Sequence, residues 1–317
     1  MKIGLDTNGG DFAPNVNIDG AILALDHIGT DKRIVLIGDA NIIEKELKAK
    51  NIAVSNFDVV HAPQNIEMCD NPVKAFESKT ESSMVKGFKM LAQSQIDCFA
   101  SIGNTGAMLV GAMHIIKPAE GIIRPCISSV YPNIQGKNNL MLDVGLNSDC
   151  KPEMLKQFAI MGSVYANLMH GIEQPKLGLL NIGTEKGKGN QHTKAAYTLL
   201  QECEQVNFVG NVEPNQIFNA DIVDVIVTDG FVGNIVLKQA EAFYGLLKNR
   251  NIKDEYFEKY NFEIYGGTPV LGLNKCVFVG HGCSNSTAVK NMILQSAKIV
   301  KVNVCEEIIK IMRYEKN

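Results

Sequence analysis

The chain has 317 residues, of which 45% are hydrophobic and 21% charged, and its formal net charge is −3. A chain of this length and balance is expected to fold as a globular protein with a sizeable core, in one large domain or two. A negative net charge argues against non-specific binding to nucleic acids, which needs a basic surface that displaces counterions. We therefore expect no nucleic acid among its partners.

The cysteines and the apolar segments indicate the compartment. Eight cysteines are spread along the chain with no Cys-x-x-Cys pair and no zinc-like spacing, so we expect free thiols and no metal site. No stretch of about 18 apolar residues is present to span a membrane, and the early Asp6 and Asp11 leave no room for a signal peptide. These features predict a cytoplasmic protein in a reducing environment.

The first part of the chain alternates strands with helices. We expect strands at residues 2–6, 33–37 and 57–61, and helices at residues 16–27 and 39–50. This alternation is typical of a mainly parallel sheet with helices on both faces. An amphipathic helix then begins at Glu81-Ser82-Ser83-Met84, where the two hydroxyls are suited either to capping the helix or to contacting a bound phosphate.

The stretch at residues 97–114 joins a buried strand to a helix of small residues through Gly103-Asn104-Thr105-Gly106. The glycines permit a sharp bend, and the helix start offers N–H groups and the positive end of a dipole. This combination predicts an anion-binding turn. The glycines are also explained by the geometry of a strand-to-helix connection alone.

Three later strands, expected at residues 140–147, 176–181 and 221–228, also end in loops rich in glycine and asparagine. A helix near Glu153 follows the first loop, the second carries Lys186 and Lys188, and the third is Asp229-Gly230-Phe231-Val232-Gly233-Asn234, followed by a helix to about Lys248. Ligands of open α/β sheets bind beyond the carboxyl ends of the strands. The two lysines therefore indicate either phosphate contact or a solvated basic turn.

The C-terminal part contains a glycine-rich joint at residues 264–272, a strand at 276–280 and a helix from 286 to 299 or as far as 314. His281 follows that strand and is suited to general acid or base catalysis, because its ordinary pKa of about 6.5 lies near working pH. A structural hydrogen-bonding role is the alternative. No repeat or linker marks a second independent domain.

Three common motifs are absent from the sequence. The chain lacks the G-x-x-x-x-G-K-[ST] phosphate loop, a G-x-G-x-x-G after the first strand, and the G-x-S-x-G nucleophile elbow. Their absence argues against a Walker-type ATP site, ordinary nicotinamide binding and serine acyl-enzyme chemistry.

Taken together, the loop motifs resemble those of the PlsX phosphate acyltransferases, in order and approximate spacing over residues 1–298. The motifs are Asp6-Thr-Asn-Gly-Gly-Asp11, Lys79 with Glu81-Ser-Ser-Met84, Gly103-Asn-Thr-Gly-Ala107, Arg124-Pro125, Leu142-Asp-Val-Gly145 with Asn147 and Asp149-Cys150, Gly183 with Glu185 and Lys188-Gly-Asn190, Asp229-Gly-Phe-Val-Gly-Asn234, Gly266-Gly267 and His281-Gly282.

This resemblance implies an acyltransferase that moves a fatty acyl group reversibly from acyl carrier protein to inorganic phosphate, forming acyl phosphate for phosphatidic acid and phospholipid synthesis. It implies a three-layer α/β sandwich similar to phosphate acetyltransferases and isocitrate-dehydrogenase-like enzymes. We expect one acyltransferase domain over residues 1–317, or two lobes around a shared cleft. The resemblance also implies a homodimer without a cofactor, a downstream glycerol-3-phosphate acyltransferase as a further partner, and peripheral contact with the inner face of the membrane.

The sequence departs from the family pattern at several positions. Thr7-Asn8 replaces a common Ala-Met, Lys79-Thr80 replaces a lysine pair, and Gly145-Leu146-Asn147 replaces Gly-Ala-Asn. The segment at residues 249–264 is shorter and more charged than the apolar hairpin of many relatives. The last difference bears on membrane attachment, which is attributed to that hairpin.

Thioester chemistry suggests roles for the loop residues. A thiolate leaves readily, so the harder tasks are to hold phosphate and to stabilise the oxyanion. The predicted catalytic residues are Lys188, Asn234, Asp229 and His281. The predicted substrate-binding residues are Ser82, Ser83, Asn104, Thr105, Gly106, Asn190, Gly230 and Gly233. Lys188 with Asn190 would hold phosphate, Asn234 or His281 would donate to the thioester oxygen, and Asp229 would orient one of them.

Because acyl carrier protein is acidic, a basic surface is expected near the site, with Arg124, Lys248 and Arg250 as candidates. Three other functions stay open at this stage. They are a phosphate acetyl- or butyryltransferase that uses coenzyme A thioesters, a non-catalytic protein that binds the acyl carrier, and a dehydrogenase on the same fold.

Overall fold

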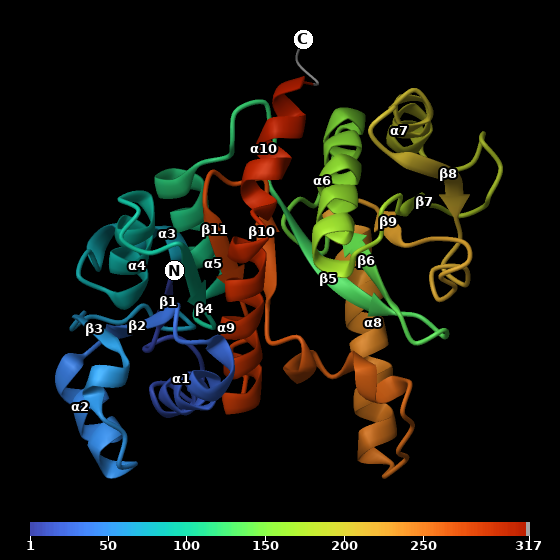
Figure 1. The fold of residues 1–317 in the computed structure, drawn as a ribbon. Helices are drawn as coiled ribbons and strands as arrows, with labels where there is room; N and C mark the ends of the chain where they lie inside the picture. The colour runs from blue at the N-terminus through green and yellow to red at the C-terminus, as the bar shows by residue number, and fades with distance from the viewer. Residues whose placement is uncertain (315–317) are drawn as a thin grey trace. The chain divides into compact units, whose positions relative to one another are not determined.

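The computed structural model describes residues 1–314 and divides into two compact units. Unit 1 consists of Met1–Pro118 and Phe262–Cys305, and unit 2 of Ala119–Asn261 together with the described residues from Glu306 onward. Each unit contains its own mostly parallel sheet with helices on both faces (Figure 1). This arrangement confirms the predicted α/β sandwich.

The sheet of unit 1 has the strand order β3-β2-β1-β4-β11-β10. All neighbouring strands are parallel except β10, which pairs antiparallel with β11. The strands are β1 (Lys2–Asp6), β2 (Arg33–Gly38), β3 (Asp58–His61), β4 (Cys98–Ser101), β10 (Thr268–Leu271) and β11 (Cys276–Val279). The carboxyl ends of β1, β4 and β11 therefore lie at one edge.

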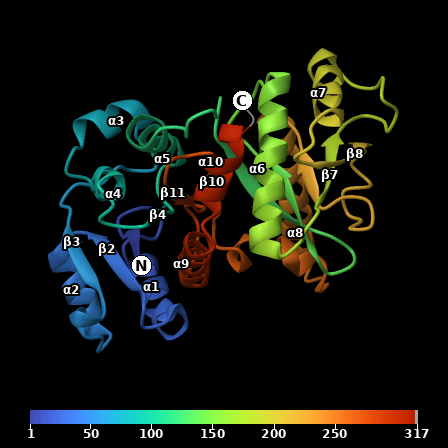
Figure 2. The same cartoon turned by 45° about the horizontal axis from the view of Figure 1, so that its top comes forward.

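Helices cover both faces of this sheet, as Figure 2 shows. On one face, α1 (Asn15–Ile28) packs against α9 (Ser286–Lys301), and α2 (Ala40–Ala49) lies beside β2 and β3. The helices of the other face are α3 (Pro72–Ser78), α4 (Ser83–Ala92) and α5 (Thr105–Gly111). Fully buried side chains from both layers, such as Phe88 on α4 and Phe99 on β4, form an aromatic contact with ring centroids 5.0 Å apart.

The sheet of unit 2 has the strand order β5-β6-β9-β7-β8, in which only β5 is antiparallel to its neighbour. The strands are β5 (Cys126–Pro132), β6 (Asn138–Leu142), β7 (Lys176–Leu180), β8 (Asn207–Val212) and β9 (Val225–Val227). One face is covered by α6 (Pro152–His170) and α7 (Gln191–Gln201), and the other by α8 (Gly230–Asn249). The last helix, α10 (Val304–Tyr314), lies mostly in this unit.

Side-chain caps explain where several helices begin. Ser82, Asn104, Asn190 and Asp229 each accept a hydrogen bond from a backbone N–H in the first turn of the helix that follows, which is the usual N-cap arrangement. Three of these four caps immediately follow the carboxyl end of a strand or the loop beyond it, so the caps place the helix starts at the same edge as the loops.

The structure differs from the sequence prediction in a few elements. The strand expected at residues 221–228 is limited to β9, and the single C-terminal helix is divided into α9 and α10 near Asn303, whose φ is 55°. Two antiparallel strands were not predicted: β5 lies where no element was expected, and β10 lies within the glycine-rich joint expected at residues 264–272. None of the eight cysteines, all of which lie within the described residues, forms a disulfide, as predicted. Among residues 1–314, no helix has the length and apolar character to cross a membrane.

Candidate functional site

A buried carboxylate anchors the loops of unit 1. Asp6, at the end of β1, accepts hydrogen bonds from Ser101 Oγ (2.7 Å) and from the backbone N–H of Asn8 (3.0 Å). Ser101 Oγ in turn accepts from the N–H of Gly103 (2.9 Å), at the start of the predicted anion-binding turn. Burial raises the pKa of Asp6, and the surrounding donors partly offset this effect. Asp6 therefore connects the ends of β1 and β4.

The loops after β1, β4 and β11 converge. A side chain at Gly9 would lie 2.7 Å from the N–H nitrogen of Gly103, so the two loops are in close contact. Asp11 donates its N–H to the carbonyl of Gly282 (2.8 Å). His281 precedes this glycine, and its ring lies against Phe262 with centroids 4.7 Å apart. The structure thus places His281 at the same edge of the unit 1 sheet as the Gly103 turn.

The polar side chains of the Gly103 turn already have structural partners. Asn104 Nδ2 donates to the carbonyl groups of Glu67, Met68 and Asp70 at 3.1–3.2 Å, while its Oδ1 caps α5 through the N–H of Ala107 (3.0 Å). The N–H groups of Thr105 and Gly106 belong to the first turn of α5, where a helix leaves donors without internal partners. A ligand at this turn would therefore meet backbone donors before side chains.

The two serines of α4 are both buried. Ser82 Oγ accepts from the N–H of Val85 (3.3 Å), which supports the capping role considered for this pair. Ser83 lies close enough to the Asp6 carboxylate to lower its pKa, yet Ser83 Oγ has no hydrogen-bond partner of ordinary length in the part of the chain that the structure describes. Within unit 1, the structure brings Ser83 to Asp6 and the Gly103 turn.

Unit 2 contains a second buried carboxylate, Asp143, directly after β6. Its Oδ1 accepts from the N–H groups of Ile127 (3.0 Å) and Leu146 (3.3 Å), and its Oδ2 accepts from the N–H (2.7 Å) and side-chain amide (2.9 Å) of Asn147. Burial raises the pKa of Asp143, and these hydrogen bonds counteract it. Asp143 therefore determines the path of the loop that follows β6.

The start of α8 packs directly on this loop. Gly230 donates its N–H to the carbonyl of Asn147 (2.7 Å), and a Cβ at Gly230 would lie 2.7 Å from Asp143 Oδ2. A Cβ at Gly233 would overlap the carbonyl oxygen of Asp143. Asn234, on the next position of α8, lies 3.4–3.5 Å from where a Cβ would stand at Gly145. Only glycines at positions 230 and 233 allow the helix start to approach this closely.

Asp229 also has a structural partner, because its Oδ1 accepts from the N–H of Val232 (2.8 Å) and caps α8. Through this cap, Asp229 holds the first turn of the helix on which Asn234 lies. The structure thus groups Asp229, Gly230, Gly233 and Asn234 around the loop after β6.

The loop after β7 presents Lys188. Asn181 Nδ2 donates to the Lys188 carbonyl (3.3 Å), and Asn211 Nδ2 donates to the Glu185 carbonyl (2.9 Å), so two asparagines hold the loop backbone. The Lys188 side chain is exposed, with its aliphatic part against Gly183. Asn190 caps α7 through the N–H of Thr193 (2.9 Å).

The Lys186 side chain contacts α7. Its Nζ donates to Gln201 Oε1 (2.7 Å) and lies 5.6 Å from the centre of the Tyr197 ring.

The loops after β9 and β7 follow neighbouring parallel strands, which are about 4.8 Å apart. Unit 2 therefore brings Lys188, Asn190 and Asn234 to one sheet edge. Ser82, Ser83, Asn104, Thr105, Gly106 and His281 occupy the corresponding edge of unit 1.

The sequence prediction did not include Asp6, Asp143, Asn147, Asn181 or Asn211 as site residues. The signal available for the two aspartates is a carboxylate at the last position of an apolar strand, followed by a glycine turn. The roles of the three asparagines depend on contacts between loops that are distant in sequence, such as Asn181 with Asn211 (3.1 Å).

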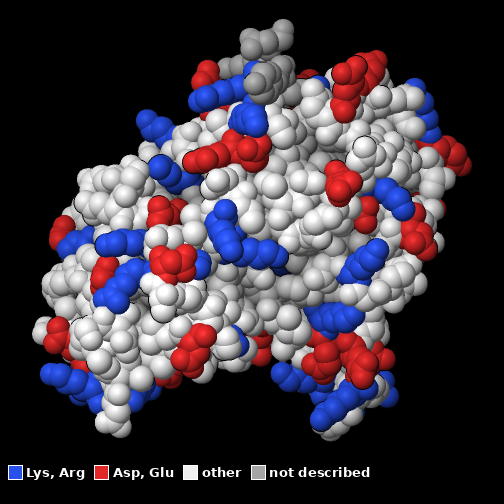
Figure 3. Space-filling model, in the orientation of Figure 1, with Lys and Arg blue, Asp and Glu red and all other residues white. Residues whose placement is uncertain are grey.

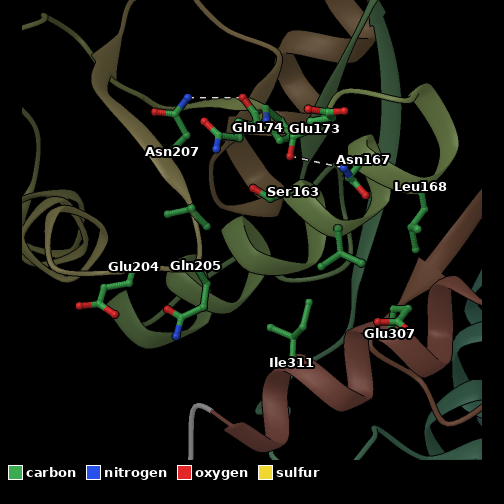
Figure 4. Close-up of a pocket in the computed structure, with 13 residues that line it drawn as sticks. Ser163, Asn167, Leu168, Glu173, Gln174, Glu204, Gln205, Asn207, Glu307 and Ile311 are labelled. Atoms are coloured by element: carbon green, nitrogen blue, oxygen red, sulfur yellow. Dashed lines mark hydrogen bonds between the residues drawn. The ribbon is translucent and has the colours of Figure 1, made fainter.

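A cavity of about 520 Å³ lies elsewhere in unit 2, near the amino ends of β7 and β8 (Figure 4). Glu173, Glu204 and Glu307 are among the residues that line it, and none of the described lining residues is a lysine or arginine. Like charges disfavour binding of phosphate in such surroundings. None of the predicted site residues lines this cavity.

Comparisons with known proteins agree with the loop pattern. The family described as "Fatty acid synthesis protein" matches residues 1–307. The phosphate acyltransferase of Acetivibrio thermocellus is 41% identical, covering 97% of this chain and 95% of that protein. The phosphate acyltransferase of Bacillus subtilis is 38% identical, covering 100% of this chain and 99% of that protein.

Solved structures agree on the fold. A phosphotransacetylase from Streptococcus pyogenes has a TM-score of 0.65 at 16% identity, with 95% of this chain and 94% of that chain covered. The EutD phosphotransacetylase from Staphylococcus aureus has a TM-score of 0.63 at 15% identity with the same coverage. From the full-length matches in sequence, the chain belongs to the PlsX family of phosphate acyltransferases, enzymes of fatty acid and phospholipid synthesis.

Proposed function

We propose that this protein transfers a fatty acyl group reversibly from acyl carrier protein to inorganic phosphate, and so supplies acyl phosphate for phosphatidic acid synthesis. The observation that carries the proposal is the sheet edge of unit 2, where the loop with the exposed Lys188 and the start of α8 follow two neighbouring strands, β7 and β9. Exposed cations and N–H donors are the groups that bind phosphate and stabilise a developing oxyanion.

In the proposed reaction, an oxygen of hydrogen phosphate attacks the thioester carbonyl carbon and the carbon–sulfur bond breaks. The thiol of the carrier leaves with the proton that hydrogen phosphate loses, so no oxidant, metal or cofactor is required. Lys188 and Asn190 would hold phosphate, and Asn234 or His281 would donate to the thioester oxygen. Asp229 would act through its cap on α8, which positions Asn234. The proposal treats the chain as one acyltransferase domain, in which Ser82, Ser83 and the turn at Asn104-Thr105-Gly106 would contact phosphate or phosphopantetheine.

The experiment compares carriers. Palmitoyl acyl carrier protein and palmitoyl coenzyme A are each incubated with the enzyme and phosphate, and hydroxylamine traps the acyl phosphate. We expect trapped product that depends on phosphate, with a kcat/KM at least tenfold higher for the carrier protein. A preference for coenzyme A would instead identify a phosphate acetyl- or butyryltransferase-like enzyme, and the absence of product with both donors would leave a carrier-binding protein.

We propose that acyl carrier protein docks through basic side chains, for which Arg124, Lys248 and Arg250 remain the candidates. The positive charges of Lys248 and Arg250, at the end of α8, are accompanied by negative charges, because residues 248–259 also include Asp254, Glu255 and Glu258. Figure 3 shows blue and red side chains mixed over this end, at the lower right. A docking surface there would depend on individual pairings more than on a uniform positive field.

We also propose a homodimer formed through α8. Phe231, Ile235 and Leu246 are 61%, 49% and 57% exposed, and their spacing of four and eleven residues places them on one side of the helix. A stripe of exposed apolar side chains of this kind marks a contact surface. Leu246→Glu is expected to convert a dimer to a monomer in sedimentation equilibrium, and an unchanged mass would contradict this interface.

We propose a cytoplasmic location for the enzyme, which is supported by eight described cysteines that form no disulfide. We include peripheral contact with the inner face of the membrane in this proposal. We also propose that the product, an acyl phosphate, is the acyl donor for a downstream glycerol-3-phosphate acyltransferase.

A further inference from the structure

An apolar cavity of about 290 Å³ lies within unit 2, away from the loops of the candidate site. It is formed by α8, β5, the segment at residues 214–218 and the short helix η3 (Phe257–Tyr260). Tyr131, Phe218, Val236, Phe243 and Phe257 are among its walls, and no charged residue from the described range 1–314 lines it. Its volume is at the lower end of the range of about 300–1,000 Å³ found for small-molecule sites.

The aromatic walls hold one another in place. The Tyr131 ring packs against Phe218 with centroids 5.4 Å apart and against Tyr260 at 5.6 Å. The Tyr260 hydroxyl bonds to the Pro132 carbonyl (3.3 Å) and to the Tyr256 hydroxyl (3.1 Å). Since these two hydroxyl groups have partners in the surrounding protein, the described walls present mainly carbon to the cavity, together with the amide of Gln239.

Helix α8 connects this cavity with the candidate site. Val232, Val236, Ala240 and Phe243 recur at intervals of four, four and three residues, so they lie on one face of the helix. The first of them is in the turn that Asp229 caps, and the last three line the cavity. At 1.5 Å per residue, the helix axis from Gly230 to Phe243 is roughly 20 Å long.

This length matches that of a long acyl chain. A carbon–carbon bond of about 1.52 Å and an angle of about 111° give roughly 1.25 Å per carbon, so a chain of about 16 carbons extends roughly 19 Å. A thioester at the start of α8 would therefore bring the methyl end of such a chain to the cavity.

We propose that this cavity binds the methyl end of the fatty acyl substrate and determines the preferred chain length. This inference rests on the proposed function, because it assumes an acyl thioester at the start of α8. The face of α8 with Val232 and Val236 would carry the middle of the chain, and the rings of Tyr131, Phe218 and Phe243 would surround its end.

The test measures kcat/KM for palmitoyl and octanoyl acyl carrier protein in wild-type enzyme and in Ala240→Leu, which fills part of the cavity. If four methylenes are excluded, the rate constant with palmitoyl carrier should fall on the order of 100-fold, since each buried methylene is worth a factor of about four. The octanoyl chain extends only about 9 Å, to the level of Val236 and short of Ala240, so its value should stay within about twofold. Ala242→Leu makes the same change at an exposed position that does not line the cavity, and the ratio of the two substrates should be unchanged there.

Because Ala240 is buried, its replacement by leucine can disturb folding, so a second variant tests the inference independently. Phe243→Ala removes a half-exposed wall, and we expect kcat/KM to fall about tenfold with palmitoyl carrier and little with octanoyl carrier. Equal changes for both chain lengths, or an unchanged ratio in both variants, would overturn the inference. Wild-type enzyme that forms no acyl phosphate from either carrier would instead refute the proposed function.

Discussion

Replacing Lys188 with alanine is expected to lower kcat/KM for phosphate by a factor on the order of 10³, with little change in melting temperature. A pair of unit charges at about 4 Å is worth around 4 kcal/mol at an effective dielectric constant near 20. The Lys188 side chain is exposed and its loop is held by backbone contacts to Asn181 and Asn211, so its removal should leave the fold intact. Initial rates of acyl phosphate formation at varied phosphate concentration measure the effect.

Lys186→Ala is the matched control for this variant. It removes the same charge from the same loop, but the Lys186 ammonium group bonds to Gln201 and lies over Tyr197. We expect its kcat/KM for phosphate to stay within about threefold of wild type, because a screened surface charge contributes little. If the two variants lost activity equally, general electrostatic attraction would explain the result and Lys188 would have no specific role.

Gly233→Ala is expected to destabilise the protein by about 3 kcal/mol and to reduce acyl transfer. The added Cβ would overlap the carbonyl oxygen of Asp143, and a backbone atom held by a buried network cannot move aside cheaply. The start of α8 would have to shift away from the loop after β6 and carry Asn234 with it. Urea denaturation and acyl phosphate formation at a temperature where the variant is folded measure the two effects separately.

The same helix provides a control at Gly245, where an added Cβ would meet no described atom within 4 Å. Gly245→Ala should be neutral or stabilise by about 0.5–1 kcal/mol, since alanine has the higher helix propensity, and activity should be unchanged. A comparable loss of stability in both variants would show that helix α8 tolerates no substitution, and the argument from Asp143 would then fail.

Much of the fold could be predicted because parallel strands in this chain are apolar runs separated by helices, as at β1, β2, β4 and β7. The two antiparallel strands could not be predicted in the same way. The strand β5 contains two serines and ends in proline, and β10 contains Pro269 beside Gly266 and Gly267, so both resemble loops.

The strand β9 was predicted too long because Ile222 and Val223 are β-branched and lie next to the apolar run of β9. In the structure, Ile222 closes a turn with Asn219, and the Asp224 carboxylate accepts the N–H of Lys176 (2.9 Å) at the start of β7. Such side-chain-to-backbone competition is not visible in hydrophobic periodicity.

For the candidate site, the loop motifs in the sequence predicted both the position of the site loops and the family of the protein. The family is confirmed. The individual roles stay predictions. Asn104 and Asn190 were predicted to contact substrate and Asp229 to orient a catalytic side chain, and each caps a helix in the structure. Both roles favour the same short polar side chains at helix starts, so the sequence alone does not separate them.

The order in which the chain is synthesised determines when each unit has all of its strands available for folding. Unit 2 draws its five strands, β5 to β9, from one uninterrupted stretch, residues 119–261. Unit 1 is divided, because β4 pairs with β11 and α1 packs on α9, and both of these partners come after that stretch. During synthesis on the ribosome, the edge of β4 therefore has no strand to pair with and α1 has no helix to cover it until residues 276–301 emerge. A chaperone would find exposed apolar surface on the first third of the protein during this interval.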